Sequence, residues 1–280
     1  MASLFIPGCP MIPIVDMHCH LLAGMDDGPK EMAEAREMCS MLAGQGVGAV
    51  HALAHQNEQY PLVTPGLIRE NITLLRNEVR AHKIPLAIFP GSEVMVHPST
   101  LLRTDQKQYL TIGDTGQFML IELPHGIFID LRDIVAGLME RRIRPILAHP
   151  EQSRELLFSE RMAEDLIRLG CLFQLSTGNV TMPMDKTHGR AIKSWVQRGF
   201  VHVIGSDGHS PTRRPPLLAE AAQVIGQWVN PLATNRICGM NGMAILQGLP
   251  LRIDPPQAPR TLYWHLTNWA KKLTNNNRGS

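Results

Sequence analysis

The sequence lacks the features that mark several common classes of protein. Its five cysteines are odd in number and no two of them have CxxC spacing, which argues against a zinc ribbon, a thioredoxin motif and a disulfide framework. No apolar run is long enough to form a transmembrane helix. The N-terminal segment is interrupted by prolines and has no basic start typical of a signal peptide. We therefore expect a cytoplasmic protein without membrane insertion.

An excess of charge of one sign is also missing. The 280 residues contain 27 Lys and Arg against 25 Asp and Glu, so the net charge is only +2. This balance disfavours a protein that binds the phosphate backbone of a nucleic acid. A compact anionic substrate is still compatible with it, because a local site needs only a few cations.

Short apolar runs alternate with longer helical patterns along most of the chain. The runs predict seven strands, at 12–16, 47–53, 86–89, 118–122, 145–148, 172–175 and 201–204. The patterns between them predict helices at 30–43, 64–82, 131–142, 160–169, 186–198 and 217–229, with 91–117 mostly a loop. Runs that are apolar at every position are typical of buried parallel strands. The sequence therefore predicts an α/β fold, either a closed or nearly closed barrel or an open doubly wound sheet.

No domain boundary is visible before about residue 250. We expect one barrel domain over 1–255 and a C-terminal extension over 256–280, partly disordered, with a short helix that contains Trp264 and Trp269. The sequence does not decide whether the protein forms a homo-oligomer.

Ionisable side chains follow six of the seven predicted strands. His18 and His20 end the first strand and are two residues apart, so they point to the same side of an extended backbone. The others lie at later strand ends or, for two of them, beside the first strand: Asp16, Asp27, His55, Glu93, Glu122, His149, Asp207 and His209. Each residue taken alone is as compatible with a structural role as with a functional one. If all of them had only structural roles, about ten ionisable groups would lie on one rim with no cations to compensate them, which is costly.

Such a set of imidazoles and carboxylates is typical of a site for divalent transition metals. It suits Mn, Fe or Zn better than calcium. The set is too large for one tetrahedral ion, so we expect two or three ions. Ions of this kind favour hydrolysis of a phosphate ester, because they stabilise the charge that develops on phosphorus oxygens.

The order of these motifs resembles that of the PHP (polymerase and histidinol phosphatase) superfamily. Within it, the chain is similar to the bacterial manganese-dependent protein tyrosine phosphatases of capsule and exopolysaccharide operons. The motifs are DMHCH and DDGPK near residue 20, then GSEV at 91–94, LIE at 120–122, AHPE at 148–151 and SDGH at 206–209. The resemblance implies a distorted seven-stranded TIM-like barrel, the PHP fold, with a trinuclear metal site.

The resemblance also implies three sets of ligands. The first ion would take His18, His20, Glu93 and Asp207; the second Glu93, Glu122 and His149; and the third Asp27, His55 and His209. Asp16 would orient a ligating imidazole. Arg214 would bind phosphate through a bidentate guanidinium, with Arg213 as a rival.

Two positions depart from the family pattern. Gln56 stands where an imidazole or basic group is usual, and Gln152 stands where an arginine is common. Our leading hypothesis is a phosphatase that removes phosphate from tyrosine in a protein, in particular the tail of a tyrosine autokinase. The alternatives are a small-molecule phosphomonoesterase similar to histidinol phosphatase and a metal-bound regulator that binds a kinase without turnover.

Overall fold

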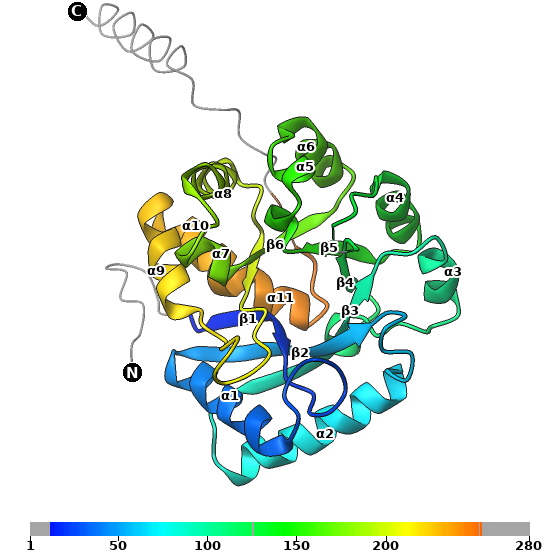
Figure 1. The fold of residues 1–280 in the computed structure, drawn as a ribbon, viewed down its shortest axis with the longest axis vertical. Helices are drawn as coiled ribbons and strands as arrows, with labels where there is room; N and C mark the ends of the chain where they lie inside the picture. The colour runs from blue at the N-terminus through cyan, green and yellow to red at the C-terminus, as the bar shows by residue number, and fades with distance from the viewer. Residues whose placement is uncertain (1–11, 125, 252, 254–280) are drawn as a thin grey trace, which may run out of the picture.

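The computed structural model describes residues 12–124, 126–251 and 253, and these residues form an α/β barrel (Figure 1). Seven parallel strands lie side by side in chain order. They are β1 (Ile14–His20), β2 (Val47–Gln56), β3 (Ala87–Met95), β4 (Phe118–Glu122), β5 (Arg144–Ala148), β6 (Leu172–Ser176) and β7 (Val203–Gly205). The predicted α/β barrel is confirmed, and the alternative of an open doubly wound sheet is wrong.

The barrel is nearly closed between its first strand and the segment that follows its last strand. The backbone N–H of Asp207 donates to the carbonyl of His18 over 2.7 Å, and His20 donates to the carbonyl of Gly208 over 2.9 Å. Cys19 and Gly208 form an isolated parallel bridge. These contacts bring the start and the end of the barrel together at the carboxyl ends of the strands.

Helices surround the strands and alternate with them along the chain (Figure 1). They are α1 (Met32–Gly44), α2 (Pro65–Ala81), α3 (Thr100–Asp105), α4 (Arg132–Glu140), α5 (Arg154–Leu157), α6 (Glu160–Arg168), α7 (Thr177–Thr181), α8 (Lys186–Arg198), α9 (Ala219–Trp228), α10 (Pro231–Asn235) and α11 (Asn241–Leu246). Three further single turns are η1 (Ile112–Asp114), η2 (Pro150–Gln152) and η3 (Arg236–Met240). No helix among the described residues is both long and apolar enough to cross a membrane.

Local sequence determines where the best-defined helices begin and end. In α2, the Thr64 side chain accepts a hydrogen bond from the N–H of Leu67, and Pro65 occupies the first turn, where it needs no donor. In α8, the Asp185 carboxylate accepts from two backbone N–H groups, and Gly199 ends the helix at φ 76°. The predicted bounds 186–198 and 118–122 agree with α8 and β4.

Apolar side chains form two layers of core. The outer layer lies between strands and helices, and a smaller inner layer fills the barrel. In the inner layer, Ile245 and Leu246 of α11 pack with Val15, Met17 and Leu53 of the first two strands. The barrel is therefore a packed core rather than a pore, so the polar site lies at the strand ends.

The structure differs from the predicted elements mainly at their ends. β1 continues to His20, and β3 continues through Pro90 to Met95, so the polar residues there belong to the strands and not to the following loops. The segment 91–117 is mostly irregular but contains α3 and η1. The turns of helix over 231–246 were not predicted. The predicted terminal helix and the division at residue 255 lie outside the described residues or at their edge, and remain predictions.

Candidate metal centre

The carboxyl end of β1 places two imidazoles inside the barrel mouth. The side chains of His18 and His20 are fully buried. Their Nε2 atoms lie 3.2 Å apart. This arrangement follows from the two-residue spacing in an extended strand, because alternate side chains point to the same side.

Glu93 of β3 lies at the centre of the histidines. One of its oxygens, Oε2, lies 3.2 Å from Nε2 of His18, 3.3 Å from Nε2 of His20 and 3.3 Å from Nδ1 of His55. The other, Oε1, lies 3.0 Å from Nε2 of His149. His55 and Glu93 are direct partners in the β2–β3 register. A carboxylate with neighbours on both oxygens has the placement expected of a group shared between two ions.

The remaining acids and His209 complete the cluster from three segments. Glu122, the last residue of β4, has Oε1 3.2 Å from Nδ1 of His55. Asp27 has Oδ1 3.4 Å from Nε2 of His209. Asp207 has Oδ1 3.4 Å from Nε2 of His18. The structure therefore brings together the side chains of all nine residues that the sequence predicts as ligands.

Their ligand atoms fall into four overlapping groups, each within 4.8 Å. The groups are His20, Asp27, His55 and His209; His18, Glu93 and His149; His18, His20 and Asp207; and His55, Glu93 and Glu122. The first group contains the three ligands predicted for the third ion, together with His20. The third group contains three of the four ligands predicted for the first ion. His149 groups with His18 rather than with Glu122, so the division among individual ions remains a prediction.

The chemistry of the buried atoms fits a cluster of divalent metals. Nδ1 of His55, both carboxylate oxygens of Glu122 and Nε2 of His209 are buried and have no hydrogen-bond partner among the described residues. Although His55 and Glu122 lie close, their contact does not have hydrogen-bond geometry. Buried polar atoms without partners are costly unless a ligand satisfies them. Mixed nitrogen and carboxylate donors suit Mn, Fe or Zn.

Comparisons with known proteins identify the family of the chain. A model of the family described as capsular polysaccharide synthesis, CpsB/CapC, matches residues 14–247. The chain belongs to the CpsB/CapC family. Its relatives include the tyrosine-protein phosphatase YwqE of Bacillus subtilis, 27% identical over 76% of this chain and 84% of the relative. The tyrosine-protein phosphatase CpsB of Streptococcus pneumoniae is 26% identical over 76% of this chain and 90% of that protein.

A solved structure supports the same fold. A chain from the crystal structures of YwqE from Bacillus subtilis and CpsB from Streptococcus pneumoniae, described as metal-dependent tyrosine phosphatases, superposes with a TM-score of 0.78. It is 23% identical, and the match covers 89% of this chain and 100% of that chain. The barrel of this CpsB/CapC protein is thus the fold of that structure.

Two imidazoles of this CpsB/CapC protein are held by groups that the sequence analysis did not select. The Asp26 carboxylate lies 2.7 Å from Nδ1 of His20, and the Gln174 amide oxygen lies 2.9 Å from Nδ1 of His18. Each contact leaves Nε2 directed at the cluster. Asp26 is part of the DDGPK motif, where turn chemistry explained it equally well, and Gln174 lies in the apolar run of β6. Neither residue carried a distinct signal in the sequence.

Asp16 does not contact an imidazole. Its Oδ1 accepts hydrogen bonds from the backbone N–H of His18 and of Ser206, and its Oδ2 accepts from the Ser206 hydroxyl over 2.6 Å. The contact with an imidazole that was predicted for Asp16 is made by Asp26 instead. Asp16 instead joins β1 to the segment after β7, and burial raises its pKa to about 6.

Opposite charges inside the cluster change the protonation of its members. Burial opposes charge on His149, but the Glu93 carboxylate outweighs it and raises the pKa of His149 to about 9. Burial likewise opposes charge on His20, but Asp26 and Glu93 raise its pKa well above the usual value. Burial would raise the pKa of Glu93, but the nearby imidazoles hold it well below its usual range. His18 has the largest effect, followed by His149 and His20. These contacts therefore favour the charged forms of His149, His20 and Glu93.

Two cluster residues adopt unusual backbone conformations. His149 has φ 34° and Asp207 has φ 53°, both in the left-handed region that non-glycine residues rarely occupy. Each is the first or second residue after its strand. Backbone strain of this kind concentrates at functional sites, where the surrounding structure imposes it.

Arg214 is the arginine that contacts the cluster. Its Nη2 lies 2.7 Å from Oδ2 of Asp207, and its Nη1 lies 4.0 Å from Oδ2 of Asp27. For Arg213, the described contact is a backbone one, in which its N–H donates to Ser210 Oγ. The guanidinium of Arg214 is half exposed, so it remains available to an anion at the cluster.

The two departures from the family pattern have different surroundings. Gln56 is buried, and its amide donates to the carbonyls of Val63 and Gln108 and accepts from the N–H of Leu110. It therefore connects the end of β2 to two loops and does not face the candidate ligands. Gln152 is exposed at the end of η2.

Tyr60 is a neighbour of the cluster that the sequence analysis missed. Its ring is parallel to that of His55, with 4° between the planes and 5.7 Å between the centroids. Burial and the carboxylates of Asp27 and Asp26 raise the pKa of its hydroxyl, so the phenol stays neutral. A lone tyrosine in a polar loop has no signature in the sequence that would identify it.

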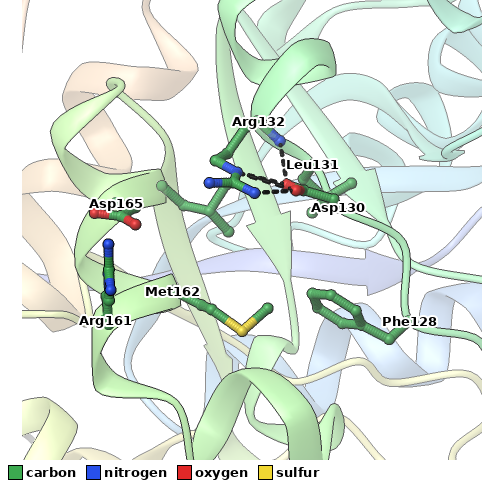
Figure 2. A pocket seen from close by; sticks show the side chains of 8 residues that line it. Phe128, Asp130, Leu131, Arg132, Arg161, Met162 and Asp165 are labelled. Carbon is green, nitrogen blue, oxygen red and sulfur yellow. Dashed lines mark hydrogen bonds and ion pairs between the residues drawn. The ribbon is translucent and has the colours of Figure 1, made fainter.

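A separate cavity of about 200 Å³ lies between the segment after β4 and helix α6 (Figure 2). Phe128 and Met162 form an apolar part of its wall, and Arg132 is paired with Asp130 at its edge. None of the nine cluster residues lines it. The candidate chemistry therefore belongs to the strand ends and not to this cavity.

Proposed function

We propose that this protein is a metal-dependent protein-tyrosine phosphatase of capsular or exopolysaccharide synthesis. The observation that carries the proposal is the convergence of nine imidazole and carboxylate side chains from the ends of six strands and the loop after β1. Membership of the CpsB/CapC family supports it, as do relatives named tyrosine-protein phosphatases. The substrate would be a phosphotyrosine-containing protein, for which we infer the tail of a tyrosine autokinase in the cytoplasm.

The residues of the chain would divide the work between binding and positioning. His18, His20, Asp27, His55, Glu93, Glu122, His149, Asp207 and His209 would hold two or three ions, with manganese as the metal that we propose. When bound, the ions would activate water and neutralise charge on the phosphoryl group. Asp26 and Gln174 keep the imidazoles of His20 and His18 directed at the cluster.

Arg214 would bind the oxygens of the phosphoryl group. A guanidinium suits this role because it donates two parallel hydrogen bonds to one anion. The leaving group would be a phenol with a pKa of about 10, which needs less protonation than an alkyl alcohol. This requirement agrees with a site made almost entirely of candidate ligands.

Steady-state hydrolysis by manganese-loaded protein tests the proposal. We expect kcat/KM for a phosphotyrosyl peptide to be at least about tenfold higher than for histidinol phosphate. His149→Ala should abolish turnover of both, whereas His82→Ala, on the exposed end of α2, should leave it unchanged. A preference for histidinol phosphate would indicate the small-molecule phosphomonoesterase instead. Retention of metal without any turnover would indicate the regulator.

A further inference from the structure

The cluster is buried around His18, His20, Glu93 and Glu122 and is most exposed at Asp27. Side chains of His18, His20, Glu93 and Glu122 are at most 1% exposed, whereas Asp27 is 46% exposed. His55, Asp207 and His149 lie between these values, at 13, 12 and 11%. The side of the cluster at Asp27 is therefore its most exposed opening for a substrate.

Two side chains of different chemistry border this opening. The guanidinium of Arg214 contacts both Asp27 and Asp207. The aromatic ring of Tyr60 lies against His55 and within electrostatic range of Asp27. An aryl phosphate carries the two complementary groups, an anion and a ring, joined through one oxygen.

The face of Tyr60 extends beyond His55. Parallel rings in contact lie about 3.5–4 Å apart, so rings with centroids separated by 5.7 Å are displaced sideways. Part of the tyrosine ring is therefore left uncovered, in keeping with its partial exposure. Aromatic pairs favour this offset arrangement, and a second ring can extend the stack.

The loop that carries Tyr60 is held in place from both ends. The Asn57 side chain accepts hydrogen bonds from the backbone N–H groups of Gln59 and Tyr60. The N–H of Val63 donates to the carbonyl of Tyr60, and the buried amide of Gln56 donates to the carbonyl of Val63. A ring fixed in this way binds a partner at a lower entropic cost than a mobile one. The glutamine at position 56 thus supports the wall of the opening instead of contacting the ions.

We propose that Tyr60 contacts the aryl ring of the substrate and makes the site select aryl over alkyl phosphate monoesters. The inference rests on the proposed phosphatase function and adds to it the residue that recognises the leaving group. The competing role for Tyr60 is purely to support His55. In that case its loss would affect every phosphate ligand equally.

Calorimetric titration with two non-hydrolysable phosphonates separates these roles without relying on turnover. Manganese-loaded wild type, Tyr60→Ala and Tyr60→Phe are titrated with phenylphosphonate and methylphosphonate, after their metal contents are matched by mass spectrometry. We expect wild type to prefer phenylphosphonate by about tenfold. Tyr60→Ala should reduce this ratio to about one, mainly by weakening phenylphosphonate, and Tyr60→Phe should restore it. Leu62→Ala, an exposed apolar change in the same loop, is the matched control and should keep the ratio of wild type.

Three results would overturn the inference. They are a wild type without aryl preference, a preference that survives in Tyr60→Ala, and an equal loss for both phosphonates in that variant. Failure of the phosphatase proposal is distinguishable, because it would appear as absent hydrolysis while the phosphonate ratios still respond to Tyr60.

Discussion

Asp26 and Asp16 are buried acids ten residues apart that contact different kinds of group. Asp26 accepts from an imidazole of the cluster as well as from the backbone N–H groups of Gly28 and His55, whereas Asp16 accepts from backbone N–H groups and a hydroxyl but from no imidazole. A carboxylate that holds a ligating imidazole increases its basicity and fixes its tautomer. The two residues should therefore respond differently to loss of charge.

We expect Asp26→Asn to weaken metal binding by about 10- to 100-fold, because His20 loses its charged partner. Asp16→Asn should instead lower the free energy of unfolding by about 1–3 kcal/mol, because an amide cannot accept from all of its present donors. Metal titration and urea unfolding of both variants measure the two effects. Equal losses of metal affinity in the two variants would contradict this division.

The pH dependence of the metal-free protein should reveal the His149–Glu93 pair. The pKa of His149 is raised from 6.5 to about 9. A raised histidine pKa stabilises the folded state fully below pH 6.5, and this stabilisation is lost as pH rises through 9. We expect the free energy of unfolding of wild type to fall by about 2 kcal/mol more than that of His149→Asn between these values. Urea unfolding in chelator at both pH values measures it, and parallel profiles would refute it.

At this scale the sequence identified the side chains that gather at the rim better than the groups that contact them. Histidines and acids at strand ends form a pattern because the carboxyl ends of parallel strands meet at one rim. Asp26 had no such pattern, since an acid before Gly28 is equally typical of a turn. Gln174 contacts His18, which is far away in the sequence, and Tyr60 stacks on His55 from an irregular loop, so local spacing reveals neither contact.

Among the elements, β3 shows where pattern and structure diverge. Pro90 removes a backbone donor and therefore predicts the end of a strand. Pairing with β2 nevertheless continues as far as Gln56 and Val94. The following residue, Gly91, leaves room for the buried ring of His51, and a β-carbon at this glycine would lie 1.9 Å from Nε2 of that ring.

Gly91→Ala should therefore lower the free energy of unfolding by about 1–3 kcal/mol or more, because the ring of His51 must move. A second change, His51→Ala, should recover part of this loss. A double-mutant cycle by urea unfolding measures the coupling between the two sites. Strictly additive effects would show that the glycine is needed for another reason.

At the scale of the whole molecule, alternation of apolar runs and helical patterns predicted an α/β fold with a buried parallel sheet, because each strand must be covered on both faces. Closure was not predictable from this pattern alone. It depends on hydrogen bonds between the end of β1 and Gly208, which are separated by most of the chain. The same closure carries Asp207 and His209 to the histidines of β1, so the fold and the cluster form together.

The central claim is that nine side chains, brought together from the carboxyl ends of six strands and the loop after β1, hold a cluster of divalent ions. Anomalous diffraction at the manganese absorption edge, from crystals grown with manganese, tests it most directly. We expect two or three peaks among His18, Glu93, His149, Asp207 and their neighbours, each about 2.0–2.3 Å from nitrogen or oxygen ligands. No peak at these residues, or peaks only elsewhere on the protein, would contradict the account.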